Sequence, residues 1–197
     1  MAGDIESLPF FKDRVELAGP QGAAINRIKC NDRTVLLIRK WQSLNMELKA
    51  ARSETMSCLE ASEGKGGAVV LKIADRPRFD SLQATISSHN EQIAALETAI
   101  RRLDAMGELW FSDLEYECGS YGRVEVGERR RIANMGAAVL QRRANTGKPT
   151  DEILAEDPEF QRLKGVCENT ISDANKRLET LRPRLEEMKA ILEGVGC

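Results

Sequence analysis

The stretch SLQATISSHNEQIAALETAIRRLDAMGELWFSDL, residues 81–114, decides the expected fold. Mostly apolar side chains return along it at alternating spacings of three and four residues. That spacing keeps one stripe of a helix facing a partner helix, and it is typical of a coiled-coil seam. We therefore expect one long helix with a partner on its apolar side. Its seam positions are Leu82, Ile86, His89, Ile93, Leu96, Ile100, Leu103, Gly107, Trp110 and Leu114.

Two further segments, residues 37–58 and 171–195, repeat the same spacing. The residues at their boundaries agree with helix ends. Asp32 is expected to cap the first helix, Asp80 begins a capping box for the second, and Asp157 opens the last. The sequence therefore predicts three long helices.

Two short segments depart from the helical spacing. Residues 68–73 are apolar and β-branched, and residues 121–126 alternate polar and apolar side chains. A strand needs a partner for its backbone groups, so these segments either pair, within the chain or between subunits, or form ordered loops. The expected fold class is mainly α: an elongated helical hairpin or coiled-coil bundle of three long helices, with a small β-containing patch.

The same patterns divide the chain into four parts. The first 30 residues have the least regular pattern, and the others are organised around the long helices. The expected parts are an N-terminal arm (1–30), a long helical hairpin (31–117) with a strand-containing connection (61–80), a loop or strand with a basic helix (118–150), and an acidic turn with the C-terminal long helix (151–197).

Composition narrows the location and the partners. The 197 residues include 29 basic and 31 acidic side chains, and this balance argues against extended duplex binding. The longest apolar run, residues 68–71, is far shorter than the roughly 20 residues of a membrane span, so no membrane partner is expected. Five scattered cysteines without a CxxC motif indicate reduced thiols in a cytoplasmic protein, with a virion as the other location that fits.

No residue set predicts chemistry. The single histidine, His89, lies on a seam, where a polar side chain more often sets helix register than performs catalysis. The glycines of residues 64–67 precede a strand-like segment, whereas a phosphate-binding loop follows a strand and opens a helix. We therefore expect no catalytic residue, no cofactor site and no metal site.

Charged residues are segregated along the middle of the chain. Five acidic side chains in residues 104–117 and five in residues 151–159 flank a basic helix, residues 129–143. These blocks are solvated faces, neutralise each other within the chain, or complement a partner. The candidate interaction residues are Phe10, Phe11, Phe111, Tyr121, Arg129, Arg130, Arg131, Arg142 and Arg143.

These expectations favour a non-catalytic, self-associating structural or scaffolding protein. Its helices would act as spacers, and its arm, β segments and charged helix would make contacts with itself, as a homo-oligomer, or with other proteins of an assembly such as a virus particle. The main alternative is a nucleic-acid-associated regulator that uses the basic helix 129–143. An enzyme with a site formed only at a subunit interface is a third hypothesis.

Overall fold

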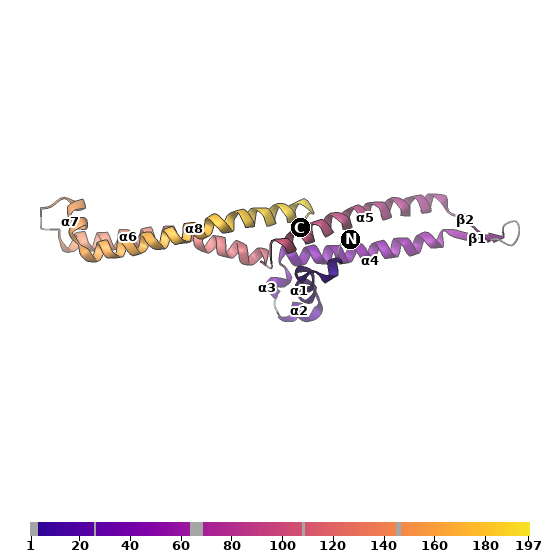
Figure 1. The fold of residues 1–197 in the computed structure, drawn as a ribbon, viewed down its shortest axis with the longest axis horizontal. Coiled ribbons are helices and arrows are strands. Elements are labelled where there is room, and N and C mark those ends of the chain that lie inside the picture. Colours follow the sequence, from indigo (N-terminus) through magenta and orange to yellow (C-terminus); the bar gives the residue numbers. More distant parts are fainter. Residues whose placement is uncertain (1–3, 26, 64–68, 108, 145–146) are drawn as a thin grey trace. The chain divides into compact units, whose positions relative to one another are not determined.

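The computed structural model describes residues 4–25, 27–63, 69–107, 109–144 and 147–197. The chain divides into two compact units. The first comprises Met1–Phe111 with Met188–Cys197, and the second comprises Ser112–Glu187. The elements, labelled in Figure 1, are the 3-10 helix η1 (Ile5–Ser7), α1 (Pro9–Ala18), α2 (Pro20–Ile25), α3 (Arg27–Cys30), α4 (Arg33–Ser57), β1 (Leu59–Glu63), β2 (Val69–Ile73), α5 (Arg76–Ala105), α6 (Phe111–Arg142), α7 (Thr150–Glu156) and α8 (Pro158–Gly194).

The helical hairpin of the first unit is made by α4 and α5, which lie side by side (Figure 1). The expected cap at Asp32 is confirmed, because its carboxylate accepts the Thr34 N–H at 2.9 Å. The expected cap at Asp80 is wrong. Asp75 accepts the Arg78 N–H at 3.1 Å instead, and the helix begins one turn earlier than predicted.

Both helices bury the stripe that the spacing predicts. Leu44 and Leu48 of α4 are buried, as are Leu96, Ile100 and Leu103 of α5. Burial of such aliphatic side chains is the main favourable contribution to the stability of the pair.

The lone histidine occupies its expected seam position on α5. Its ring is half-buried, and His89 Nε2 lies 3.6 Å from Glu47 Oε2 of α4. A polar contact of this kind across two helices fixes their register.

The strand-like segment 68–73 is a strand from residue 69 onward, and residue 68 lies outside the described residues. Its partner is β1, which pairs with β2 in an antiparallel hairpin at the end of α4 and α5 (Figure 1). The sequence LEASE of β1 has low β propensity, so alternation and composition did not mark it as a strand.

The second predicted strand is wrong, because residues 121–126 lie inside α6. Tyr121 and Val124 are three residues apart, so a helix also places them on one face. Both are half-buried there, and they line one cavity with Ala174 of α8. Since these residues are helical, the considered pairing of residues 68–73 with residues 121–126 does not occur in the part of the chain that the structure describes.

The single long helix expected over residues 82–114 is also wrong. α5 ends at Ala105, and Gly107 takes a positive φ of 91° before α6 begins at Phe111. Glycine adopts this conformation without steric cost, which makes it a natural end for a helix. The described chain therefore has four helices of 25 residues or more, α4, α5, α6 and α8, where three were expected.

The second unit contains α6, α7 and most of α8. A cluster of buried side chains, Val139, Ile153 and Phe160, joins one residue from each helix. The expected cap at Asp157 is confirmed, because its Oδ1 accepts the Phe160 N–H at 2.9 Å. Pro158 follows as the first residue of α8, where its missing N–H costs nothing.

Two exposed glycines inside α6 give a testable prediction. A Cβ added at Gly119 or Gly127 would meet no atom within 4 Å, so alanine fits without strain. Each Gly→Ala substitution should raise the free energy of unfolding by about 0.8 kcal/mol, because glycine is the poorer helix former. Thermal denaturation followed by circular dichroism measures this gain.

The matched control is Gly136, the buried glycine of the same helix. A Cβ there would lie 3.4 Å from Cε2 of Phe160 and 3.7 Å from Cδ2 of Leu154. These are ordinary van der Waals distances, so a methyl group fits there too, and Gly136→Ala should gain at least as much stability as the exposed substitutions because its methyl group is also buried. A clearly smaller gain, or a loss, at Gly136 would contradict the packing described for this helix.

Candidate functional site

The N-terminal segment expected to be an arm is helical and packs on the hairpin. Phe10 and Phe11 of α1 are buried, and α1 contacts both α4 and α5. The Phe10 N–H at the start of α1 donates to Asp104 Oδ1 of α5 at 3.0 Å. A carboxylate from a distant helix thus caps α1, and the two phenylalanines are core residues in this fold.

A buried arginine lies beside these rings. The guanidinium carbon of Arg14 is 4.2 Å from the ring centroid of Phe10 and 4.0 Å from that of Trp110. Its side chain is 1% exposed, and Nη1 lies 3.7 Å from Asp13 Oδ2. A cation between two aromatic faces is attracted by both, and the attraction strengthens when water is excluded.

Two further basic side chains extend this aromatic cluster. Lys29 Nζ lies 5.0 Å from the Trp110 ring centroid, and the guanidinium carbon of Arg33 lies 4.7 Å from that of Phe111. Phe111, a candidate interaction residue, is 7% exposed. Its ring therefore contributes to the first unit's own packing.

Residues 195 and 197 are hydrogen-bonded to side chains of α4 in the first unit. Arg33 Nε donates to the Cys197 carbonyl at 3.1 Å, and Lys40 Nζ donates to the Val195 carbonyl at 2.6 Å. Burial raises the pKa of the Cys197 thiol, although Lys40 and Arg33 act in the opposite direction. These two cations thus satisfy carbonyl groups of the residues that follow the C-terminal end of α8.

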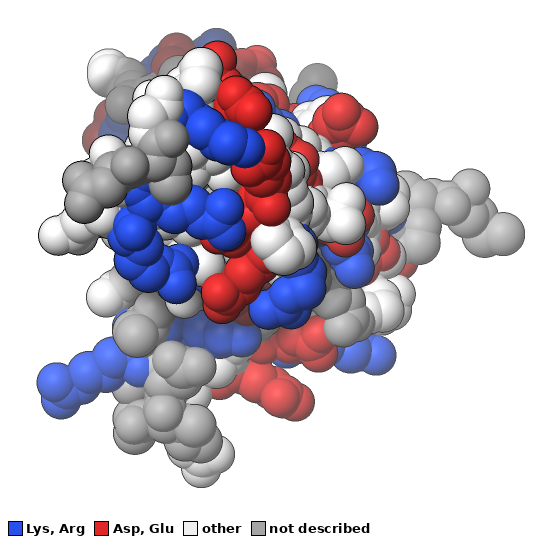
Figure 2. Space-filling view, turned by 90° about the vertical axis from the view of Figure 1, so that its left-hand side faces the viewer, with Lys and Arg blue, Asp and Glu red and all other residues white. Residues whose placement is uncertain are grey.

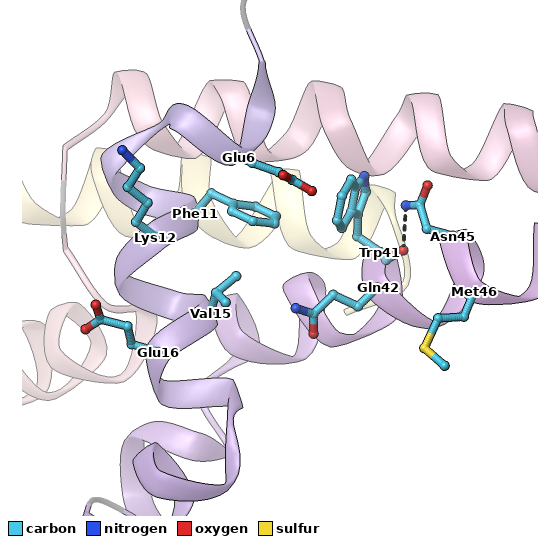
Figure 3. A pocket seen from close by; sticks show the side chains of 9 residues that line it. All are labelled: Glu6, Phe11, Lys12, Val15, Glu16, Trp41, Gln42, Asn45 and Met46. Carbon is cyan, nitrogen blue, oxygen red and sulfur yellow. Dashed lines mark hydrogen bonds between the residues drawn. The ribbon is translucent and has the colours of Figure 1, made fainter. Parts of the chain in front are cut away.

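An open groove of about 800 Å³ lies between α1 and α4 (Figure 3). Aromatic and aliphatic side chains lie in its middle, and charged or amide side chains stand around them. Its lining residues are Glu6, Phe11, Lys12, Val15, Glu16, Trp41, Gln42, Asn45 and Met46.

Two rings form the floor of the groove. Phe11 and Trp41 meet edge to face, with centroids 5.1 Å apart and planes at 84°. The indole N–H of Trp41 donates to Glu97 Oε1 of α5 at 3.3 Å, which fixes the ring, and Asn45 Nδ2 donates to the Trp41 carbonyl at 2.8 Å. The floor is therefore pre-organised rather than free to collapse.

The rim differs from the floor in charge and exposure. The side chains of Glu6, Lys12 and Glu16 are exposed, and Met46 is 73% exposed at one end. This combination can hold an apolar side chain against the rings and pair a basic group with the glutamates. The lining offers carboxylates, amides and one ammonium group around an apolar floor. These groups can hydrogen-bond or ion-pair with a polar partner while the floor contacts its apolar part.

The candidate basic residues of α6 mostly face acceptors of their own chain. Arg129 Nε donates to Glu125 at 2.7 Å, and Arg131 lies 3.6 Å from Glu128. On the face shown in Figure 2, acidic and basic side chains lie side by side. Glu125 and Glu128 belong to the same helix as the arginines and to neither of the flanking acidic blocks.

The arginines at the end of the basic helix also face acceptors of their own chain. Arg143 Nη2 lies 3.5 Å from Asp157 Oδ2, and Arg142 Nε donates to the Ala138 carbonyl at 3.4 Å. Lys148 contacts Glu156 at 2.6 Å, and this hydrogen bond lowers the pKa of Glu156 and raises that of Lys148. The side chain of Arg130 is exposed to solvent.

The groove brings together residues that no sequence pattern singled out. Of its lining, only Phe11 was a candidate interaction residue, whereas Trp41 lies in the segment 37–58, where the spacing predicted a helix packed on a partner. The helical spacing of Phe11 and Val15 was a signal, because residues four apart share a face. The groove's residues belong to the first unit. Further candidate residues belong to the second unit: Tyr121, Arg129, Arg130, Arg131, Arg142 and Arg143.

Metal-binding clusters and membrane-spanning helices are absent from the described residues. No group of three or more metal-ligating side chains lies together in the ranges that the structure describes. Within the same ranges, no helix combines the length and apolar character needed to cross a bilayer.

Comparison with known proteins found no matching family model, no matching curated protein and no matching solved structure.

Proposed function

We propose that this chain is a non-catalytic, self-associating structural or scaffolding protein, with its helical hairpin as a spacer. The groove between α1 and α4 carries this proposal. Its aromatic floor and charged rim reproduce the anatomy of a protein interface, in which aromatic residues and methionine are enriched at the core and charged groups at the edge.

Exposed apolar side chains elsewhere in the first unit support the same proposal. Met56 of α4 is 62% exposed, and Leu71 of β2 is 59% exposed. A larger assembly would cover such side chains with neighbouring molecules, and a virus particle is one setting of this kind. Partners would then be further copies of this chain and other proteins of the assembly.

Light scattering after size-exclusion chromatography tests self-association. The chain has a mass of 21.9 kDa, so a particle of at least twice that mass is expected at micromolar concentration. The mass should fall on dilution if the association is reversible. A particle of 21.9 kDa over the whole concentration range would contradict the proposal.

The alternative function, a nucleic-acid-associated regulator using residues 129–143, has one supporting observation, the exposure of Arg129, Arg130 and Arg131. The ion pairs of Arg129 and Arg131 with their own helix reduce the charge available to phosphates. Fluorescence anisotropy with a labelled duplex at low salt separates the two functions. Salt-sensitive binding that disappears in the double variant Arg130→Glu, Arg142→Glu would favour the alternative.

A further inference from the structure

The β-hairpin of the first unit has two chemically different faces. Its register places Leu59 opposite Ile73 and Ala61 opposite Leu71. Side chains alternate along a strand, so these four residues share one apolar face. The opposite face carries Glu60, Ser62, Val70 and Lys72.

This apolar face is only partly covered within its unit, because Leu59 and Ile73 are half-buried. Leu71 is 59% exposed, and Ala61 is exposed as well. Among the described residues the sheet consists of two strands. A two-stranded ribbon is only marginally stable in water, and further strands or a covered apolar face are needed for lasting order.

The outer edge of β2 is suited to pairing. The Ala74 N–H donates to the Cys58 carbonyl at 2.9 Å, which sets the phase of the hydrogen bonds between the two strands. Hydrogen-bonded and non-hydrogen-bonded residue pairs alternate along an antiparallel ribbon. The N–H and C=O groups of residues 60, 62, 70 and 72 therefore point toward the other strand of the hairpin. The backbone groups of Leu71 and Ile73 consequently point away from β1, along the outer edge.

We propose that β2 of a second copy of this chain pairs antiparallel with this edge, with Leu71 opposite Leu71 of the second copy. Two hairpins then form one four-stranded sheet. Directly opposite residues of an antiparallel pair share a face, so the two apolar faces become continuous. The proposal rests on the proposed function and assigns self-association to this strand edge, which leaves the groove between α1 and α4 to other proteins of the assembly.

The composition of the two strands favours the β2 edge over the β1 edge. β2 has the sequence VVLKI, which is rich in the β-branched residues that strands prefer. β1 has the sequence LEASE, in which two of five residues are acidic, so pairing along the β1 edge would add like charges to one sheet. The one charged residue of β2, Lys72, already lies opposite Glu60 of its own hairpin.

Disulfide trapping tests the register. Leu71→Cys would place two thiols on directly opposite residues, whose Cα atoms are about 5.5 Å apart in a hydrogen-bonded pair and within disulfide reach. Ala61→Cys is the matched control, on the same rung and the same face. In the four-stranded sheet, residue 61 of one copy would lie three strand spacings, about 14 Å, from residue 61 of the other copy. The background carries Cys118→Ser and Cys197→Ser, since these two native thiols are the half-buried ones.

Mild oxidation should link Leu71→Cys into a dimer about tenfold more than Ala61→Cys, because only the first pair lies within disulfide reach. More linkage of Ala61→Cys, equal linkage of both, or linkage of neither would overturn the proposed pairing. Linkage only when the two variants are mixed would indicate β1-to-β2 pairing between copies, and it would also overturn the proposal.

A second experiment separates this inference from the proposed function. Leu71→Lys should reduce the particle mass measured by light scattering to that of one chain, with an unchanged circular dichroism spectrum. Val126→Lys, at a comparably exposed apolar residue of α6 in the second unit, should leave the mass unchanged. If the wild type self-associates and Leu71→Lys does so equally, the inference fails while the proposed function stands. A monomeric wild type contradicts both.

Discussion

Replacing Arg14 with alanine is expected to lower the free energy of unfolding of the first unit by about 3 kcal/mol. The guanidinium lies about 4 Å from two ring centroids, and its side chain is almost fully buried. Alanine would remove both cation–π contacts and leave a cavity between Phe10 and Trp110. The loss comes from packing as well as charge, because the aliphatic stem of an arginine also covers apolar surface.

Tryptophan fluorescence during urea unfolding measures this effect selectively. Trp41 and Trp110 are the chain's two tryptophans, and both belong to the first unit. Arg142→Ala is the matched control, since that arginine is exposed on α6 of the second unit. It should change the stability by less than about 0.5 kcal/mol.

Arg14→Lys tests how much the planar shape of the guanidinium group contributes to the stability of the first unit. Lysine keeps the charge but lacks the planar group that stacks on rings, so its loss should be smaller than that of alanine. An alanine variant as stable as the wild type would contradict the role assigned to Arg14. A lysine variant less stable than the alanine variant would contradict a stabilising charge at this position.

Asp157→Ala is expected to lower the free energy of unfolding of the second unit by about 2 kcal/mol. The buried carboxylate accepts the Phe160 N–H at the start of α8, and it also lies near Arg143. Its removal leaves the Phe160 N–H without this acceptor in a buried place. The second unit contains no tryptophan, so thermal denaturation followed by circular dichroism is the suitable measurement.

Two neighbouring variants separate the cap from the ion pair. Asp157→Asn keeps an acceptor for the Phe160 N–H and should lose less than half as much stability as alanine. Arg143→Ala removes the partly exposed ion pair alone and should cost less than about 1 kcal/mol. A larger loss in Arg143→Ala than in Asp157→Ala would show that the ion pair, not the cap, holds this end of α8.

Local rules predicted the features that depend on near neighbours in the sequence. Asp32 and Asp157 cap helices because each carboxylate reaches an N–H two or three residues away. The apolar stripes of α4 and α5 were predictable for the same reason, since spacing alone decides which side chains share a face. Even the lone histidine lies where the spacing placed it.

Features that depend on distant residues were not predictable. The burial of Arg14 requires Trp110, nearly a hundred residues later, and no local pattern links the two. The hairpin requires β1, whose LEASE sequence resembles a helix or loop more than a strand. Residues 121–126 fit both a strand and a helix, and their pattern alone did not decide between the two.

The groove also combines features that depend on near neighbours in the sequence with features that depend on distant residues. The shared face of Phe11 and Val15 was readable from the sequence, but the edge-to-face meeting of Phe11 and Trp41 depends on how α1 returns to α4. Its charged rim includes Glu6 and Glu16, which in the sequence are ordinary solvated acids. A binding surface built from two segments became visible only after those segments were placed together.

The glycines of α6 have a consequence for motion. At Gly119, Gly122 and Gly127 a Cβ would meet no other atom within 4 Å, so these positions face open space and make no side-chain contacts. By contrast, α5 contains no glycine over its 30 residues. Brief openings of the hydrogen-bond ladder should therefore concentrate in this part of α6, and its amide protons should exchange with solvent sooner than those of α5.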